Sequence, residues 1–129
     1  MEEKKKLLII EDDDLTQKFF QTYLSSYFGV YSCFTVDEFY KKITENKYDI
    51  ILMDLSLRGS KDGLDLTKEL RITEQYRTTP IIALTANALK RDEEASYKAG
   101  ITKFLRKPID NKTLLKTLLG FANKSSENI

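Results

Sequence analysis

Two kinds of apolar pattern alternate along the chain, and this alternation is the feature that most restricts its fold. Short runs of apolar and β-branched residues, typical of buried strands, occur at residues 7–10, 30–34, 49–53, 81–84 and 104–105. Each run is followed by apolar residues at helical spacing, within residues 15–27, 36–43, 66–70, 88–99 and 114–122. The pattern predicts an α/β fold, a doubly wound five-stranded parallel sheet with five helices on its two faces.

The details of this pattern give three further expectations. Leu15, Phe19, Tyr23 and Tyr27 recur every four residues, with Phe20 and Leu24 beside them, and this stripe is typical of a helix. All five glycines lie near the ends of expected elements, so none should interrupt an element. The polar end, residues 123–129, predicts a disordered tail after a single domain at residues 1–122.

Composition excludes several classes of function. With 21 basic and 20 acidic residues the net charge is +1, which argues against direct binding to nucleic acid or to an anionic membrane. No apolar run approaches the ~20 residues of a membrane helix. The chain has no histidine, so imidazole bases and His-ligated zinc are excluded. The lone Cys33 lies in an apolar stretch, which predicts a core residue and fits a cytoplasmic location.

Polar residues gather where the expected strands end. The acidic residues 11–14 (EDDD) follow the first strand, Asp54 ends the third, Thr85 ends the fourth, and Lys107 follows the fifth. In doubly wound sheets, ligands bind beyond the carboxyl ends of the strands, which lie at one edge. We therefore expect these side chains to meet there.

Each of these residues also has a plain structural interpretation, as an N-cap, a turn former or a solvated charge. Asp54, however, would face the acidic run across neighbouring strands. The repulsion between these negative charges must be offset, and a Mg²⁺ ion can do this. A carboxylate beside a metal can attack phosphorus. The phosphoryl oxygens then require a metal, an ammonium and a hydroxyl donor, which Asp12, Asp54, Thr85 and Lys107 supply together. We expect Asp14, further into the helix start, to cap the first helix instead.

At these positions the chain resembles the receiver domains of two-component response regulators, over about residues 5–122. The matching segments, in order, are LLIIEDD, IILMDL, the DG pair that contains Gly63, PIIALTANA and AGITKFLRKPID. The resemblance implies a flavodoxin-like receiver fold and a role in a phosphorelay. Asp54 would accept a phosphoryl group from a histidine kinase or a histidine phosphotransfer protein. The segment ALTANALKRDEEASYKAG resembles receivers attached to hybrid histidine kinases.

The resemblance also implies a metal site. Asp12, Asp54 and the backbone carbonyl of Ser56 would bind Mg²⁺, or Mn²⁺ in its place, and Glu11 would act through water. The domain would not be an enzyme in the usual sense, because it would catalyse only its own phosphorylation and dephosphorylation.

A switch is implied as well. Thr85 and Lys107 would contact the phosphoryl oxygens, and Phe104 would turn as Thr85 moves. This movement would reshape the face formed by the fourth helix, fifth strand and fifth helix, which a downstream protein would read. The peptide between Lys107 and Pro108 would be cis.

The chain departs from the commoner family pattern after Asp54. Gly63 lies nine positions further on, where eight is more usual, and the loop residues LRGSK lack a proline. We expect the extra residue to bulge away from the phosphoryl pocket. Ser56 and Asn87 occupy positions that tune the lifetime of the acyl phosphate in the family.

Three other classes share parts of this pattern. A flavin-binding domain would need a phosphate-cradling loop where the acidic run stands. A haloacid-dehalogenase-like phosphatase would normally have an aspartate in place of Ser56 and a cap insertion. A pseudo-receiver scaffold would normally lack Asp54, an acid of the pocket or Lys107. Labelling by a small-molecule phosphodonor separates these classes, while the cognate kinase and the attachment to a larger protein stay open.

Overall fold

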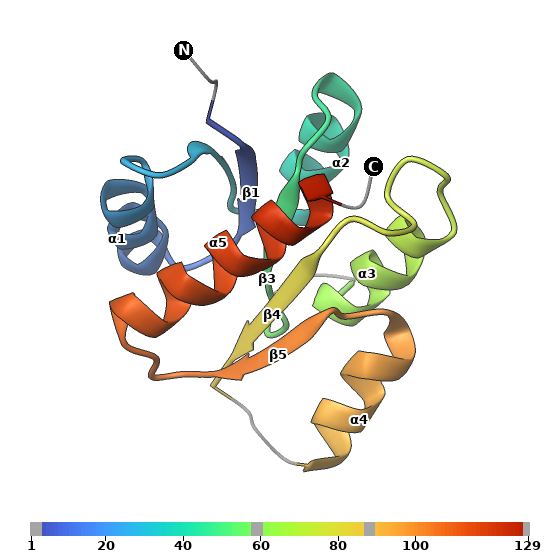
Figure 1. Cartoon of the computed structure of the whole chain (residues 1–129). Coiled ribbons are helices and arrows are strands. Elements are labelled where there is room, and N and C mark those ends of the chain that lie inside the picture. Colours follow the sequence, from blue (N-terminus) through green and yellow to red (C-terminus); the bar gives the residue numbers. More distant parts are fainter. Residues whose placement is uncertain (1–3, 58–60, 87–89, 128–129) are drawn as a thin grey trace.

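The computed structural model describes residues 4–57, 61–86 and 90–127 and has the predicted architecture (Figure 1). In these residues the strands form one parallel sheet of order β2-β1-β3-β4-β5. The order reverses beside β1, as it does in doubly wound sheets. The strands are β1 Lys6–Ile10, β2 Gly29–Cys33, β3 Ile50–Asp54, β4 Ile81–Thr85 and β5 Lys103–Arg106.

The helices of the described residues cover both faces of this sheet (Figure 1). They are α1 Asp14–Leu24, α2 Val36–Glu45, α3 Gly63–Arg71, α4 Lys90–Ala99 and α5 Asn111–Glu127. Successive strand residues point to opposite faces, so the core divides in two. Leu8 and Ile51 pack in the cluster that includes residues of α2 and α3, whereas Leu7 and Leu52 pack with residues of α1 and α5. Within the described ranges, no helix is long and apolar enough to cross a membrane.

The parallel register brings the carboxyl ends of the strands to one edge of the sheet. Ile10 pairs with Met53 between β1 and β3, and Thr85 pairs with Arg106 between β4 and β5. Asp54 follows Met53 as the last residue of β3. The residues just after β1 and β5 therefore meet Asp54 and Thr85 at this edge, as the strand ends predicted.

Only part of the apolar stripe predicted for the first helix lies in the core. Leu15 is 79% exposed and Phe19 is 50% exposed, while the buried residues of α1 are Gln17, Phe20 and Leu24. Residues 17, 20 and 24 are themselves three and four positions apart, so this helix has two faces with suitable spacing. Packing against the sheet buries the face with Phe20 and Leu24 and leaves Leu15, Phe19 and Tyr27 exposed to solvent.

The C-terminal helix is longer than predicted. Helix α5 continues to Glu127, so residues 123–127 are helical where a disordered tail was expected, and residues 128–129 lie outside the described range. Residues 121–127 contain no proline or glycine to stop the helix. Gly120 lies inside α5 and not near its end as expected, but the helix continues through it; Gly59 is among the residues not described. The boundary of the domain at residue 122 stays a prediction.

Arg71, the last residue of α3, joins four segments of the chain. Its guanidinium donates hydrogen bonds to the carbonyls of Tyr76 and Thr79, both at 2.7 Å, in the loop before β4. It also donates to the carbonyl of Gly100 at 2.8 Å and to the hydroxyl of Thr102 at 3.2 Å. Gly100 has a φ of 114°, and a Cβ there would lie 2.6 Å from Arg71 Cγ. The C-terminal end of α4 is therefore attached to the end of α3.

The close approach of α3 to the end of β3 predicts that Gly63→Ala is destabilising. A Cβ at residue 63 would lie 2.6 Å from the Asp54 carbonyl oxygen and 2.9 Å from Leu55 Cα, which are both backbone atoms. We expect a loss of about 1–3 kcal/mol in the free energy of unfolding, measured by urea titration. Gly120→Ala is the control, because it meets open space in a helix and should gain about 0.5–1 kcal/mol. A Gly63→Ala protein as stable as wild type would contradict the contact.

Candidate functional site

Three carboxyl groups from neighbouring strands converge at the carboxyl edge of the sheet. Glu11 and Asp12 follow β1, and Asp54 ends β3. Each offers an oxygen, and these three oxygens lie within 4.8 Å of one another. Glu11 is 2% exposed and Asp54 is 5% exposed, so water screens their charges poorly. Carboxylate oxygens are the ligands that hard divalent cations prefer, and the group could hold such an ion.

Hydrogen bonds fix the two buried carboxyl groups. Lys107 Nζ donates to Glu11 Oε1 at 2.8 Å, and the Asp13 N–H donates to Glu11 Oε2 at 3.2 Å. The Ser56 N–H donates to Asp54 Oδ1 at 3.0 Å. Lys107, which the resemblance assigns to the phosphoryl oxygens, is therefore bound to Glu11 in this structure.

The surroundings of Asp54 raise its pKa from the ordinary 3.8 to about 6. Burial is the largest cause; the hydrogen bond from Ser56 lowers the pKa, and the neighbouring Glu11 raises it again. For Lys107, burial lowers the pKa, but the bond to Glu11 and the charge of Asp54 raise it overall. An ionised Asp54 is thus unfavourable in the metal-free protein, and a cation beside it would relieve that penalty.

This pKa shift predicts how the stability of the metal-free protein depends on pH. Between pH 3.8 and about 6 the folded chain keeps a proton at Asp54 that the unfolded chain has released. The contribution of this group to stability is therefore complete below the lower value and is lost as the pH rises through the upper one. A rise of roughly two in the pKa of Asp54 corresponds to about 3 kcal/mol of unfolding free energy.

We expect Asp54→Asn to be more stable than wild type by up to ~3 kcal/mol at neutral pH in EDTA, and equally stable below the ordinary pKa. Urea unfolding at a series of pH values measures this difference. Asp14→Asn, an exposed carboxylate of the same edge, is the control and should show no such rise. A difference between Asp54→Asn and wild type that does not change with pH would contradict the shift.

Thr85 lies beside the loop that follows Asp54. Its hydroxyl oxygen is 3.3 Å from that of Ser56, and Thr85 is buried at the end of β4. The Lys107 N–H donates to the Thr85 carbonyl at 2.8 Å, so the pairing of β4 with β5 continues one residue beyond Arg106. The peptide between Lys107 and Pro108 is cis, as predicted.

In the acidic run after β1, the residue that caps the helix lies one position earlier than predicted. Asp13, not Asp14, caps α1, because its carboxylate accepts hydrogen bonds from the Thr16 N–H at 2.9 Å and from the Thr16 hydroxyl at 2.7 Å. An N-cap requires extended backbone, which Asp13 has. Asp14 is the first helical residue, where a negative charge favours the helix dipole.

Phe104, the expected switch residue, is buried and bound to α4. Its N–H donates to the hydroxyl of Tyr97 at 3.1 Å, and Arg106 forms an ion pair with Glu93 at 3.0 Å. These two contacts connect β5 to α4. Asn87 and the loop residues 58–60, for which the sequence gave rise to expectations, lie outside the described residues.

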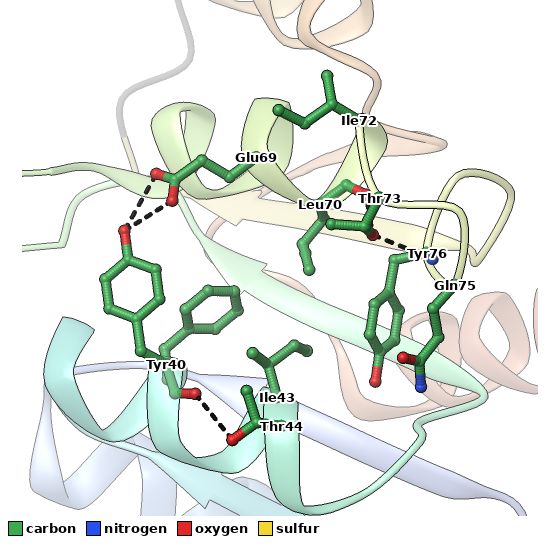
Figure 2. Close-up of a pocket in the computed structure, with 10 residues that line it drawn as sticks. Tyr40, Ile43, Thr44, Glu69, Leu70, Ile72, Thr73, Gln75 and Tyr76 are labelled. Atoms are coloured by element: carbon green, nitrogen blue, oxygen red, sulfur yellow. Dashed lines mark hydrogen bonds between the residues drawn. The ribbon is translucent and has the colours of Figure 1, made fainter.

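A concave region of about 550 Å³ lies elsewhere, between α2 and α3 (Figure 2). Among its polar groups, the Tyr40 hydroxyl donates to Glu69 at 2.8 Å and accepts from Lys61 Nζ, just outside the lining, at 2.7 Å. It contains none of the predicted site residues. The lining residues are Phe39, Tyr40, Ile43, Thr44, Glu69, Leu70, Ile72, Thr73, Gln75 and Tyr76.

The comparison with known families agrees with the geometry of the strand ends. The response regulator receiver domain model matches residues 7–119. The chain belongs to this family. This receiver domain is 32% identical over 118 residues to the polar-differentiation response regulator DivK of Brucella ovis, which covers 91% of this chain and 95% of DivK. The DivK protein of Brucella anthropi is also 32% identical, over 119 residues.

Solved receiver structures share the fold. The receiver domain of the sensor histidine kinase PA1611 from Pseudomonas aeruginosa, with a magnesium ion in its active site cleft, is 33% identical; the match covers 93% of this chain and 98% of that one, with a TM-score of 0.83. For CheY4 of Vibrio cholerae the identity is 26%, the coverages are 92% and 98%, and the TM-score is 0.84. The similarity to receivers of hybrid histidine kinases that the sequence suggested stays a prediction.

Proposed function

We propose that Asp54 is the phosphoacceptor of this two-component receiver domain. The observation that carries the proposal is the position of Asp54: it is buried at the end of β3, within 4.8 Å of two further carboxyl oxygens. Lys107 also lies close enough to influence its pKa. A carboxylate in such a place is suited to nucleophilic attack on a phosphoryl group.

The reaction is a transfer from nitrogen to oxygen. A carboxylate oxygen of Asp54 attacks the phosphorus of a phosphohistidine, the new P–O bond forms, and the P–N bond breaks. The bonding electron pair stays with the imidazole nitrogen, which takes up a proton. Asp12, Asp54 and the Ser56 carbonyl would hold Mg²⁺, with Glu11 acting through water, and the ion would supply positive charge to the carboxylates and the transferred oxygens.

Lys107 and Thr85 bind the phosphoryl oxygens in this proposal. Both have partners in the resting protein, since Lys107 binds Glu11 and the Thr85 hydroxyl lies beside that of Ser56. Phosphorylation therefore replaces these contacts with bonds to the new group. The charge-assisted bond from Lys107 is the stronger of the two.

The proposed donor is a histidine kinase or a histidine phosphotransfer protein in the cytoplasm. Helix α1 begins beside the site and exposes Leu15 and Phe19, and exposed apolar residues of this kind fit a protein donor. The proposed output is a downstream protein that contacts the face formed by α4, β5 and α5. The chemistry of the domain is limited to its own phosphorylation and dephosphorylation.

Intact mass spectrometry tests this function. The protein is incubated with acetyl phosphate and Mg²⁺, and we expect the mass of one added phosphoryl group. EDTA should abolish the addition, and Mn²⁺ in place of Mg²⁺ tests the second ion. A protein that binds no divalent cation and gains no mass would be an interaction scaffold, and the proposal would be wrong.

The switch can be tested with beryllofluoride, which mimics the phosphoryl group. When Thr85 moves toward the site, the contacts of Phe104 and Tyr97 should change, because these residues join adjacent elements. We expect the largest NMR shift changes outside the Asp54 pocket near Leu89, Phe104 and Leu114. Residues of α2, on the other edge of the sheet, provide the internal control. Shift changes that stay within the pocket and skip residues 86–106 would contradict the switch.

A further inference from the structure

We propose that Gln17 is a positioning residue, whose buried amide fixes the backbone that carries Glu11 and Asp12. The inference rests on the proposed function, which gives these acids a metal to bind. Gln17 is 0% exposed and lies on the inner face of α1 with Phe20 and Leu24. An apolar side chain could fill this position without burying a polar group, so the amide requires a reason.

The side-chain nitrogen of Gln17 lies among three backbone carbonyls. Nε2 is 3.3 Å from the oxygen of Ile9, 3.2 Å from that of Glu11 and 3.1 Å from that of Cys33. These oxygens belong to the end of β1, the acidic loop and the end of β2. The Cys33 carbonyl also accepts the Glu11 N–H at 3.1 Å. The amide thus contacts the Glu11 carbonyl directly, and it shares the Cys33 carbonyl with the Glu11 N–H.

The bond to the Glu11 carbonyl also determines where Asp12 lies. That carbonyl belongs to the planar peptide that joins Glu11 to Asp12, so the orientation of the plane sets the position of the Asp12 Cα. Pairing of β1 with β3 ends at Ile10, and the sheet does not orient this peptide on that side. Without the Gln17 amide, the carbonyl would lose its partner, and the loop would rearrange to find another.

The other end of the same side chain argues against a role in stability alone. Within the residues that the structure describes, Gln17 Oε1 is a buried side-chain oxygen without a hydrogen-bond partner. Buried polar atoms are nearly always paired, and an unpaired one disfavours folding. The two N–H donors of the amide are therefore shared among three carbonyls, while the oxygen of the same side chain stays without a hydrogen bond. This pattern fits a residue retained for the geometry of the acidic loop.

Two matched variants of α1 test the proposal. Gln17→Met removes the amide and keeps the length of the side chain. Gln21→Met makes the same change one turn further along, where the amide donates to the Ser32 hydroxyl at 2.7 Å and not to the acidic loop. Calorimetric Mg²⁺ titration should show affinity about 10- to 100-fold weaker for Gln17→Met, the usual effect of losing support behind a metal ligand. For Gln21→Met we expect the wild-type affinity.

A measurement on the metal-free protein tests the positioning role of Gln17 separately from the proposed function. In the metal-free protein, the amide NMR shifts of residues 11–13 should change in Gln17→Met and not in Gln21→Met. If Gln17→Met does not fold, Gln17→Asn, which draws the amide back by one methylene, should show a smaller loss of affinity in the same direction. Wild-type affinity in the folded Gln17 variant, or equal losses in both α1 variants, would overturn the positioning role. If the wild-type chain binds no Mg²⁺, the proposed function fails, and the metal-free shifts alone decide whether Gln17 holds the loop.

Discussion

We expect an Asp54→Asn variant to gain no phosphoryl group from acetyl phosphate and Mg²⁺, whereas the wild-type chain should gain one. The amide has nearly the same shape as the carboxylate, but its nitrogen is a poor nucleophile and its oxygen carries no full charge. The surrounding groups, including Lys107 and Thr85, are unchanged by the substitution. Intact mass measures the result, and a urea titration shows that the variant is folded, with the higher stability expected from removing the unfavourable charge of Asp54.

The control for this experiment is Asp14→Asn, which removes an acid from the same edge of the sheet. Asp14 is exposed and lies in the first turn of α1, so its variant should be labelled as fully as wild type. Labelling of Asp54→Asn at the wild-type level would show that another carboxylate is the acceptor. Asp12 would then be the first residue to examine, since its carboxylate belongs to the same cluster.

Asp12→Ala should reduce the affinity for Mg²⁺ by at least about tenfold, because even the loss of a group that supports a metal ligand has an effect of this size. Asp12 contributes one of the three oxygens that lie within 4.8 Å of one another. Asp14→Ala removes the same charge two residues later, outside this cluster, and should leave the affinity unchanged. Calorimetry at equal ionic strength separates the two, because screening then acts equally on both variants.

Equal losses of affinity in Asp12→Ala and Asp14→Ala would mean that the acidic run acts only through its total charge. A further comparison is Asp13→Ala, which removes the N-cap of α1. This variant should lose about 1 kcal/mol of unfolding free energy. Its effect on stability therefore distinguishes the capping residue of the run from the metal ligand.

The sequence was sufficient for the fold and for the grouping of Asp54, Thr85 and Lys107. The strands β1, β3 and β4 are buried on both faces and are nearly continuous apolar runs, so these three could be located without knowledge of their neighbours. In a parallel sheet, all carboxyl ends lie at one edge, and residues that follow the strands are brought together by topology alone. The roles of these residues in phosphoryl transfer, by contrast, stay predictions.

Other features depend on contacts that no local pattern encodes. Helix α1 has apolar residues at helical spacing on two faces, and only packing against the sheet shows that Phe20 is buried and Phe19 is exposed. The bond between Lys107 and Glu11 joins residues that are 96 positions apart in the sequence. The proposed role of Gln17 depends on carbonyls from two different strands that lie around its side-chain nitrogen. One signal was present in the sequence, because Gln17 lies three and seven positions before Phe20 and Leu24, on the face that proved to be buried.

The hydrogen bond from Arg71 to the Gly100 carbonyl holds the C-terminal end of α4, so a rotation of this helix would have its pivot there. The helix has 10 residues and is therefore about 15 Å long. Glu93 lies roughly 10 Å from the pivot and Tyr97 roughly 4–5 Å from it, at about 1.5 Å of rise per residue. A small rotation of α4 about this end would move Glu93 about twice as far as Tyr97. The ion pair between Glu93 and Arg106 would then stretch more than the hydrogen bond between Tyr97 and Phe104. A protein that contacts the first turns of α4 would thus receive an amplified displacement, while one that contacts the last turn would receive almost none.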